Sequence, residues 1–345
     1  MKSMVLTLDY ELYGNGSGDV FRHMIIPTDR ILKIARKYNA RITFFFEVVE
    51  YWKLKMEWER GNSMGYDTNP IVAIEDQLKR AYQEGHDIQL HLHPQWVDAV
   101  YVNRHWKVNL DEWRLGGYKR EGEFSLVHLL EKGKKTIENI IQPIDPGYQC
   151  IALRAGGYNI QPSQEIVKAM RSAHLYIDSS IFPGGKECGT LSRYDYSDIP
   201  VDAGFWNVGT ELEKPGKSGI MELPIVAFPL VRWKKYLTVE RIKSLLRNRE
   251  SAKNAFEAKT VGEKGKWGKI KFFLEEEWQT WDYCLFSKSM HRQFLKAIEK
   301  QSDRNVFTLV GHPKSFVSGK GLEYLLGRTR GKYSCITISQ FIKSL

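Results

Sequence analysis

The sequence predicts an α/β fold, a distorted parallel (β/α) barrel of about seven strands with helical insertions. Short apolar segments alternate with amphipathic segments along most of the chain, which is typical of a parallel sheet covered by helices. Several of the apolar segments end in a charged or imidazole side chain. A length of 345 residues suits one large α/β domain. We therefore expect a single barrel domain over residues 1–345.

The first half of the chain contains two strand and helix units. Residues 5–12 (VLTLDYEL) form the first predicted strand, and a helix that Pro27 opens follows it. Residues 41–49 (RITFFFEVV) are the next strand. A second helix has Ile71, Ile74, Leu78 and Tyr82 on one face and ends at Gly85. Residues 86–94 (HDIQLHLHP) then form a third strand.

The second half continues this pattern with one interruption. Predicted helices lie near 126–141, 166–170 and 322–326 and at the end of the chain, and predicted strands lie at 148–157, 175–182, 219–228, 305–313 and 333–338. Residues 231–300 break the pattern with long charged segments and carry 17 Lys and Arg against 9 Asp and Glu. We expect a basic helical insertion there.

Most of the net charge of +10 therefore comes from residues 231–300. Nucleic acid is not the favoured partner, because the rest of the chain is nearly balanced. Residues 231–300 could contact an anionic membrane surface peripherally, bind a phosphate-bearing sugar donor or bind RNA. They could also form an insertion that is simply solvated. No apolar stretch approaches the length of a membrane span, and the N-terminal residues do not read as a secretory signal. The expected location is the cytoplasm, and the oligomeric state stays open.

Two predicted strands carry paired polar residues on one face. Side chains alternate along a strand, so Asp9 and Glu11 share a face, and His91 and His93 share a face of another strand. Two imidazoles and a carboxylate can hold one divalent metal and still leave room for water. The simpler alternative is that each is an ordinary hydrogen-bonded residue.

Three further strands end in polar residues. Arg154 lies in ALRAGGY, Asp178 in YIDSS and His312 in LVGHP. The carboxyl ends of barrel strands form one face, where the active sites of such barrels lie. Five strands would rarely all end in polar residues by chance. We therefore expect these side chains to lie close together.

In five ordered segments the sequence resembles carbohydrate esterase family 4, the NodB-type polysaccharide deacetylases. The segments are LTLDYE, EGHDIQLHLHP, RAGGY, IDSS with the later ELP, and LVGHP. The nearest branch is that of lipopolysaccharide and surface-polysaccharide biosynthesis. The resemblance implies a hydrolase that removes the acetyl group from an N-acetylated sugar or glycan precursor with a divalent metal, most simply zinc.

The resemblance also implies a role for each matched residue. It makes Asp9 the general base and Arg154 its positioning partner. It makes His312 the general acid and Asp178 a candidate for orienting His312. The implied metal ligands are Glu11, His91 and His93, and the backbone N–H near Tyr158 would stabilise the oxyanion.

The sequence departs from the family pattern at the metal ligands. Tyr10 separates two acids that are usually adjacent, and only Leu92 separates histidines that are usually three residues apart. His86 and Gln95 are the substitute ligands that the spacing leaves open. Two alternatives also stay open: a metal-independent amidohydrolase, and a catalytically inactive barrel that binds a carbohydrate or another anionic ligand.

Aromatic residues follow the histidine strand closely. Trp96 is the predicted sugar-binding residue among them, with burial in the core as the alternative reading; the others are Tyr101, Trp106, Trp113 and Tyr118.

Overall fold

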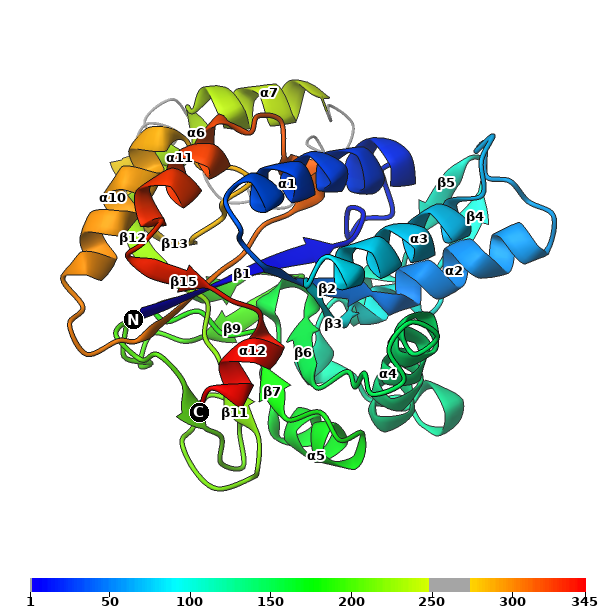
Figure 1. Cartoon of the computed structure of the whole chain (residues 1–345). Coiled ribbons are helices and arrows are strands. Elements are labelled where there is room, and N and C mark those ends of the chain that lie inside the picture. Colours follow the sequence, from blue (N-terminus) through cyan, green and yellow to red (C-terminus); the bar gives the residue numbers. More distant parts are fainter. Residues whose placement is uncertain (1, 248–273) are drawn as a thin grey trace.

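The computed structural model describes residues 2–247 and 274–345 of the chain. A curled, mostly parallel sheet of nine strands forms its centre, and helices pack on its outer side (Figure 1). The strands are β1 (Lys2–Tyr10), β2 (Ile42–Glu47), β3 (Asp87–Leu92), β6 (Ala152–Ala155), β7 (Ile177–Asp178), β10 (Trp206–Asn207), β11 (Met221–Glu222), β14 (Val306–Leu309) and β15 (Tyr333–Cys335).

The order across the sheet is β10-β11-β7-β6-β3-β2-β1-β14, and β15 also pairs with β1. An isolated bridge between Ile225 and Thr308 joins the far end of the sheet to β14 and closes the curl. The predicted distorted barrel is confirmed as the fold class. The sheet has more strands than expected because β10, which is only two residues long, lies outside every predicted strand.

Helices surround this sheet in the order of the chain. They are α1 (Ile26–Lys37), α2 (Val48–Glu59), α3 (Pro70–Gln83), α4 (Leu126–Ile141), α5 (Gln164–Ser172), α6 (Arg232–Tyr236), α7 (Val239–Arg247), α10 (Lys288–Glu299), α11 (Lys320–Thr329) and α12 (Ile338–Lys343). Helix α2 starts directly after β2 and was not predicted from the sequence. The Glu47 carboxylate caps α2 by accepting hydrogen bonds from the N–H groups of Val49 and Glu50.

Side-chain alternation in the strands separates a core from the barrel interior. Leu6, Leu8 and Tyr10 of β1 point outward into the main core beneath the helices. Val5 and Phe45 point inward, and Ile338 of α12 joins them in a second apolar cluster inside the barrel. Fully burying one such side chain contributes about 1.5–3 kcal/mol. The polar residues that follow along the same inward faces lie nearer the carboxyl ends of the strands.

The predicted insertion over 231–300 is corrected in part. Besides α6, α7 and α10 the range contains the strand β13 (Glu276–Thr280), which pairs antiparallel with β12 (Ala227–Val231). Trp281 and Phe294 belong to the main core, so this part of the range is integral to the fold. The basic segment 248–273 lies outside the described residues.

Two further short hairpins leave the sheet, β4 (Val100–Val102) with β5 (His105–Lys107) and β8 (Lys186–Cys188) with β9 (Arg193–Asp195). Among the helices of residues 2–247 and 274–345, none has both the length and the apolar character that crossing a bilayer requires.

Candidate active site

Polar residues from five strands converge at the carboxyl ends of the sheet. Glu47, His91 and Arg154 are direct neighbours across β2, β3 and β6. Asp9 and Glu11 come from the end of β1, next to β2. His312 follows β14, which pairs with the other side of β1. The structure thus brings together six of the predicted site residues, namely Asp9, Glu11, His91, His93, Arg154 and His312.

Glu11, His91 and His93 form a buried cluster with the geometry of a metal site. Their potential ligand atoms all lie within 4.8 Å of one another. Glu11 Oε2 is 2.8 Å from His93 Nε2 and 3.4 Å from His91 Nε2. The set of two imidazoles and one carboxylate is that of catalytic zinc sites with an open position for water.

The second nitrogen of each imidazole is held by the protein. His91 Nδ1 donates to the carbonyl of Arg154 over 2.8 Å, and His93 Nδ1 contacts the Gln95 amide, also at 2.8 Å. Such bonds fix ring orientation in metal-binding histidines. Within the described part of the chain, neither Nε2 atom finds a hydrogen-bond partner of acceptable geometry although both are buried. Burial lowers the pKa of His93, which keeps that imidazole neutral. The residues therefore fit a divalent cation.

Local sequence explains how His93 reaches this position. Pro94 follows it, ends the strand and keeps His93 extended with φ −113° and ψ 103°. The ring of His93 lies against Gly156 of the neighbouring turn, where a Cβ would come within 2.3 Å of its Nδ1. The first glycine of RAGGY is thus needed for close approach, and the second, Gly157, has a positive φ of 58°.

Lys314 fixes the other carboxylate oxygen of Glu11. Its Nζ donates to Glu11 Oε1 over 2.6 Å and to the carbonyl of Leu12 over 2.7 Å. Burial alone would raise the pKa of Glu11, but the Lys314 ammonium and then His93 lower it well below the usual range. Glu50 accepts from the N–H of Leu12 and pins the same turn. Burial and the Glu11 charge raise the pKa of Glu50 to about 8, so Glu50 stays protonated beside the ionised Glu11.

Arg154 holds Asp9 from inside the barrel. Its Nη1 donates to Asp9 Oδ1 over 2.7 Å and to Thr7 Oγ1 over 2.6 Å. The rest of the guanidinium is bound to Ser179 and stacks 4.2 Å above the ring of Phe45. Burial would raise the pKa of Asp9, but Arg154 and then His312 lower it far below its usual value. Asp9 is therefore a fixed, ionised carboxylate.

His312 faces Asp9 from the other side. Its Nε2 is 3.4 Å from Asp9 Oδ2, and its Nδ1 donates to Asp282 Oδ2 over 3.0 Å. Burial would lower the pKa of His312, but the hydrogen bonds and charges of Asp282 and Asp9 raise it to about 9. At neutral pH the site thus holds a carboxylate base and an imidazolium acid side by side.

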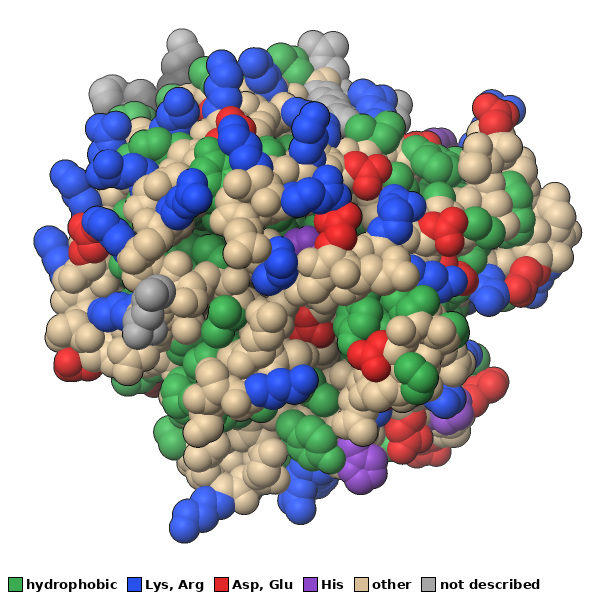
Figure 2. Space-filling view, in the orientation of Figure 1, with side chains coloured by type: hydrophobic (Ala, Val, Ile, Leu, Met, Phe, Trp, Pro, Cys, Tyr) green, Lys and Arg blue, Asp and Glu red, His purple; other side chains and the backbone are tan. Residues whose placement is uncertain are grey.

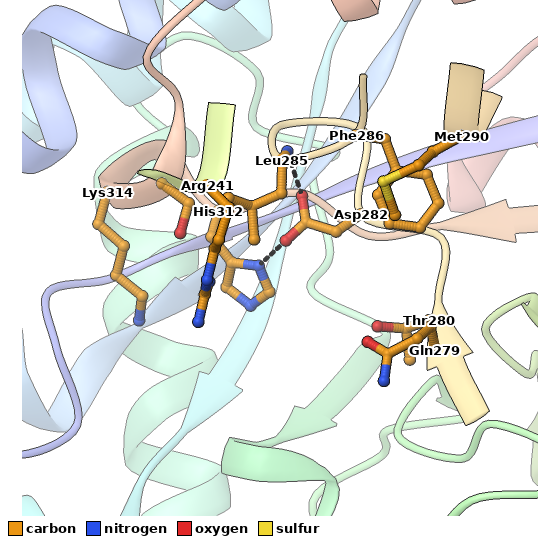
Figure 3. A pocket seen from close by; sticks show the side chains of 10 residues that line it. Arg241, Gln279, Thr280, Asp282, Leu285, Phe286, Met290, His312 and Lys314 are labelled. Carbon is orange, nitrogen blue, oxygen red and sulfur yellow. Dashed lines mark hydrogen bonds and ion pairs between the residues drawn. The ribbon is translucent and has the colours of Figure 1, made fainter. Parts of the chain in front are cut away.

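A pocket of about 250 Å³ opens beside this pair. Figure 3 shows His312 bonded to Asp282, with Lys314 and Arg241 extending alongside the imidazole. Gln279 and Thr280 of β13 form another part of its wall, and Leu285, Phe286 and Met290 add apolar surface. A substrate group of mixed polarity would fit between these walls.

Asp178 does not contact His312. Its register partner is Leu153, on the outer side of the sheet, whereas Ser179 lies on the Arg154 side. The Asp178 carboxylate accepts from the backbone and hydroxyl of Ser180 and adjoins Glu222. The expectation that Asp178 orients His312 is corrected, because the geometry gives that contact to Asp282.

Trp96 lies differently from expectation, whereas the expected role of the backbone N–H near Tyr158 stays a prediction. Trp96 is buried in the core against Trp106, so it offers no surface to a sugar. Trp113 is the aromatic beside the site, 5.9 Å from the His93 ring. Tyr158 adopts a positive φ of 63°, and its ring packs 5.3 Å from Phe182.

The two substitute ligands are also placed. His86 lies just before β3 begins, at the opposite end of that strand from the cluster, where its Nδ1 accepts from the N–H of Ile42. It is no ligand of this cluster. Gln95 contacts His93 and supports the cluster from outside.

Sequence reasoning missed Asp282, Lys314 and Glu50. Lys314 had a usable signal, because it stands two residues after His312. Glu50 lies in the unpredicted helix α2. No signal in the sequence pointed to Asp282, because it follows β13 inside the range that was expected to be an insertion.

Comparisons with known proteins agree with the fold. No protein-family model matches the sequence, and no curated protein matches it. Among solved structures, a putative polysaccharide deacetylase from Mycobacterium smegmatis superposes with a TM-score of 0.50 and 13% identity over 99% of this chain and 89% of its own. At that identity the likeness shows a shared fold.

Two weaker likenesses accompany it. A polysaccharide deacetylase from Bacillus cereus, Bc1974, gives a TM-score of 0.39 and 13% identity over 98% of this chain and 92% of its own. A 4-alpha-glucanotransferase from Thermococcus litoralis gives 0.48 and 12% identity over 99% of this chain. This chain spans 38% of the glucanotransferase.

Proposed function

We propose that this protein is a metal-dependent hydrolase that removes the acetyl group from an N-acetylated sugar. One observation carries the proposal: an ionised carboxylate and a protonated imidazole face each other at 3.4 Å beside a buried Glu, His and His cluster. Amide hydrolysis needs a base for water, an acid for the departing nitrogen and a positive charge near the carbonyl oxygen. This group of side chains offers all three.

Glu11, His91 and His93 are the proposed ligands of a divalent cation, with zinc as the preferred metal. A mixed nitrogen and oxygen set with three protein ligands favours zinc over magnesium or calcium. A bound cation supplies Lewis acidity, which polarises the acetamide carbonyl and makes water a better nucleophile. Lys314 keeps Glu11 ionised and leaves Oε2 directed at the two imidazoles.

Asp9 is the proposed general base. Its Oδ1 is engaged by Arg154, so Oδ2 is the oxygen that can accept a proton from water. Its low pKa keeps it ionised across the physiological range. Contacts with Thr7, Ser179 and Phe45 fix the guanidinium of Arg154. The Asp9 carboxylate that Arg154 holds therefore has little freedom to rotate.

His312 is the proposed general acid. As the water oxygen bonds to the carbonyl carbon and the carbon–nitrogen bond breaks, the nitrogen must gain a proton to leave as an amine. His312 Nε2 carries that proton, and the Asp282 contact at Nδ1 stabilises the imidazolium. Acetate and the free amino sugar are the products.

The shared fold and the mixed polar and apolar pocket beside His312 support an N-acetylated sugar or glycan precursor as substrate. We assign the reaction to surface-polysaccharide or lipopolysaccharide biosynthesis. That assignment rests on the resemblance of the LTLDYE, LHLHP and LVGHP segments to the corresponding branch of deacetylases.

Acetate release tests the proposal directly. Purified full-length protein is incubated with N-acetylhexosamine substrates, both nucleotide-linked and as short oligosaccharides, with and without added Zn²⁺. We expect acetate release that needs the metal and that Asp9→Asn abolishes. Asp178→Asn is the matched control, since it makes the same change outside the site and should retain turnover. Equal activity of Asp9→Asn and the wild type would overturn the assignment of the base.

One observation favours a second candidate, a metal-independent amidohydrolase. The Lys314 ammonium lies 2.6 Å from Glu11 and already brings a positive charge to the cluster. In that case turnover would survive a chelator and would be lost in Lys314→Met. Chelator-sensitive turnover would exclude this candidate, and the absence of any acetate release would leave the barrel as a binding protein.

A further inference from the structure

The helix α7 presents its apolar side to solvent in the described structure. Val239, Ile242 and Leu246 recur at three- and four-residue spacing, so they share one face, and they are 60%, 43% and 58% exposed. Ser244 is buried, and Arg241 lines the pocket beside His312. Arg241 and Ser244 therefore lie on the side of α7 that faces the protein, and Lys243 is exposed together with the apolar residues, which is the reverse of an ordinary surface helix.

The short helix α6 and the turn to α7 extend this apolar face. Sixteen large apolar side chains are exposed in the described residues, and five of these fall between residues 233 and 246. Trp233 and Leu237 are the two that precede α7. A tryptophan with exposed aliphatic neighbours is typical of a helix that lies in the interface of a membrane. Such a concentration marks an interaction surface rather than scattered exposure.

A row of cations runs along helix α10 and its C-terminal cap. Lys288, Arg292, Lys296 and Lys300 follow at intervals of four residues and are all exposed. The ring of Phe294 in α10 packs 5.2 Å from Phe228 in β12, the strand that leads directly into α6. In Figure 2 Lys and Arg side chains gather over the part of the molecule where Figure 1 shows α1, α10 and α11. The basic row and the apolar face thus belong to elements that are joined through β12.

We propose that α6, α7 and the basic row of α10 dock this protein on an anionic membrane surface. Apolar side chains would enter the interface while Lys and Arg contact lipid phosphates, and both contributions are needed for stable peripheral binding. Charge complementarity favours a bilayer over a second copy of this chain, because two such basic faces would repel each other.

Docking by this face has a consequence for the substrate, which rests on the function proposed above. Arg241 belongs both to α7 and to the pocket wall next to His312. The pocket would then open next to the lipid headgroups. An acetamido sugar carried on a lipid phosphate could enter without leaving the membrane surface, and Arg241 is a cation suited to its phosphate.

Vesicle sedimentation of the full-length protein tests the docking without any assay of turnover. We expect binding to vesicles of phosphatidylglycerol and phosphatidylcholine, and at least about ten-fold weaker binding to phosphatidylcholine alone. Ile242→Asp with Leu246→Asp should weaken binding by about ten-fold or more, because charges would enter the interface. Val72→Asp is the matched control, since Val72 is 51% exposed on α3 and lies outside this face.

Lys288→Glu with Lys296→Glu should also weaken binding about ten-fold and remove the preference for anionic lipid. Equal binding of the wild type and the α7 variant would overturn the proposal. So would a dimer, seen by light scattering, that the α7 variant dissociates, because a second copy would then cover the face. A large loss of thermal stability in the α7 variant with unchanged vesicle binding would likewise overturn it. These outcomes are independent of acetate release, so failure of the docking and failure of the hydrolase assignment are distinguishable.

Discussion

Two pairs of buried ionisable residues in this barrel, Asp9 with Arg154 and Asp178 with Glu222, show how different surroundings shift the pKa of similar carboxyl groups in opposite directions. Asp9 and Asp178 are both carboxylates near the carboxyl ends of strands, and both are buried. Asp9 lies inside the barrel with Arg154 and has a strongly lowered pKa. Asp178 lies on the outer side with Glu222, and burial raises its pKa.

The difference follows from the partner and from the side of the sheet. Arg154 and His312 compensate the charge of Asp9, so burial does not neutralise it. Glu222 offers Asp178 no positive charge, and burial followed by the Asp178 charge raises the pKa of Glu222 well above its usual value. Burial alone therefore does not identify a reactive acid. A buried acid that faces the barrel interior beside a cation is the candidate for proton transfer.

Removing Arg154, the cation beside Asp9, should have the largest effect on stability and turnover. Arg154→Met leaves Asp9 buried without its partner, which we expect to lower the free energy of unfolding by about 3–5 kcal/mol. Turnover should be lost as well, because Asp9 would no longer be held ionised in place. Chemical denaturation and acetate release measure the two effects.

Arg304 provides the control for that change. It is a buried arginine that donates to the carbonyls of Val306, Val201 and Pro224, away from the site. Arg304→Met should cost about 1–3 kcal/mol of stability yet leave the turnover of the folded fraction intact. If both variants lost stability and kept activity, Arg154 would be a structural residue only.

The acid of the site should respond to its own partner. As the proposed general acid, His312 must be protonated, so turnover should fall as the pH rises through about 9, the raised pKa of His312. Asp282→Asn removes the negative charge that raises this pKa. The high-pH limb of kcat/KM should then move down toward the ordinary imidazole pKa of about 6.5.

At pH 8 the Asp282→Asn variant should therefore lose about ten-fold or more in turnover, and less at pH 6. A pH profile recorded for both proteins provides the measurement. An unchanged high-pH limb would show that His312 is not the group that titrates.

A change in the pair of Asp178 and Glu222, on the outer side of the sheet, should have the smallest effect. It should raise the free energy of unfolding rather than lower it. The pKa of Glu222 is raised in the folded protein, so the folded state retains a proton that the unfolded state releases above about pH 4.5. Stability is therefore lost as the pH rises from there. Glu222→Gln needs no proton and should raise the free energy of unfolding by about 1–2 kcal/mol at pH 8 and by little at pH 4. Denaturation curves at both pH values would test this, and destabilisation at pH 8 would contradict the raised pKa of Glu222.

Much of the fold was predictable because its signals are local. Strict alternation in residues 5–12 and 86–94 gives both the strands and their inward faces, and with them the side of the sheet on which Asp9, Glu11, His91 and His93 lie. His93 and His312 are each followed by proline, which ends the extended segment next to the polar residue. The helix α4 runs over residues 126–141 as predicted, since its apolar periodicity is long.

The rest depends on tertiary contacts that no local pattern encodes. Asp178 was assigned to the wrong side because β7 has only two residues, too few for alternation to fix a face. Sugar binding and burial both stayed open for Trp96, because an aromatic after a strand looks the same in the sequence whether it contacts a ligand or Trp106. Asp282 reaches His312 from 30 residues away in sequence, through a bridge between Asp282 and Val310.

The metal content of the purified protein tests the central claim most directly. We predict about one zinc ion per chain after dialysis against Zn²⁺, and loss of that ion in His91→Ala and His93→Ala. His86→Ala should retain it, because His86 is a buried histidine at the opposite end of β3. A wild-type protein that binds no zinc, or one that binds it equally well without His91 and His93, would contradict the assignment of these strand ends as a metal centre.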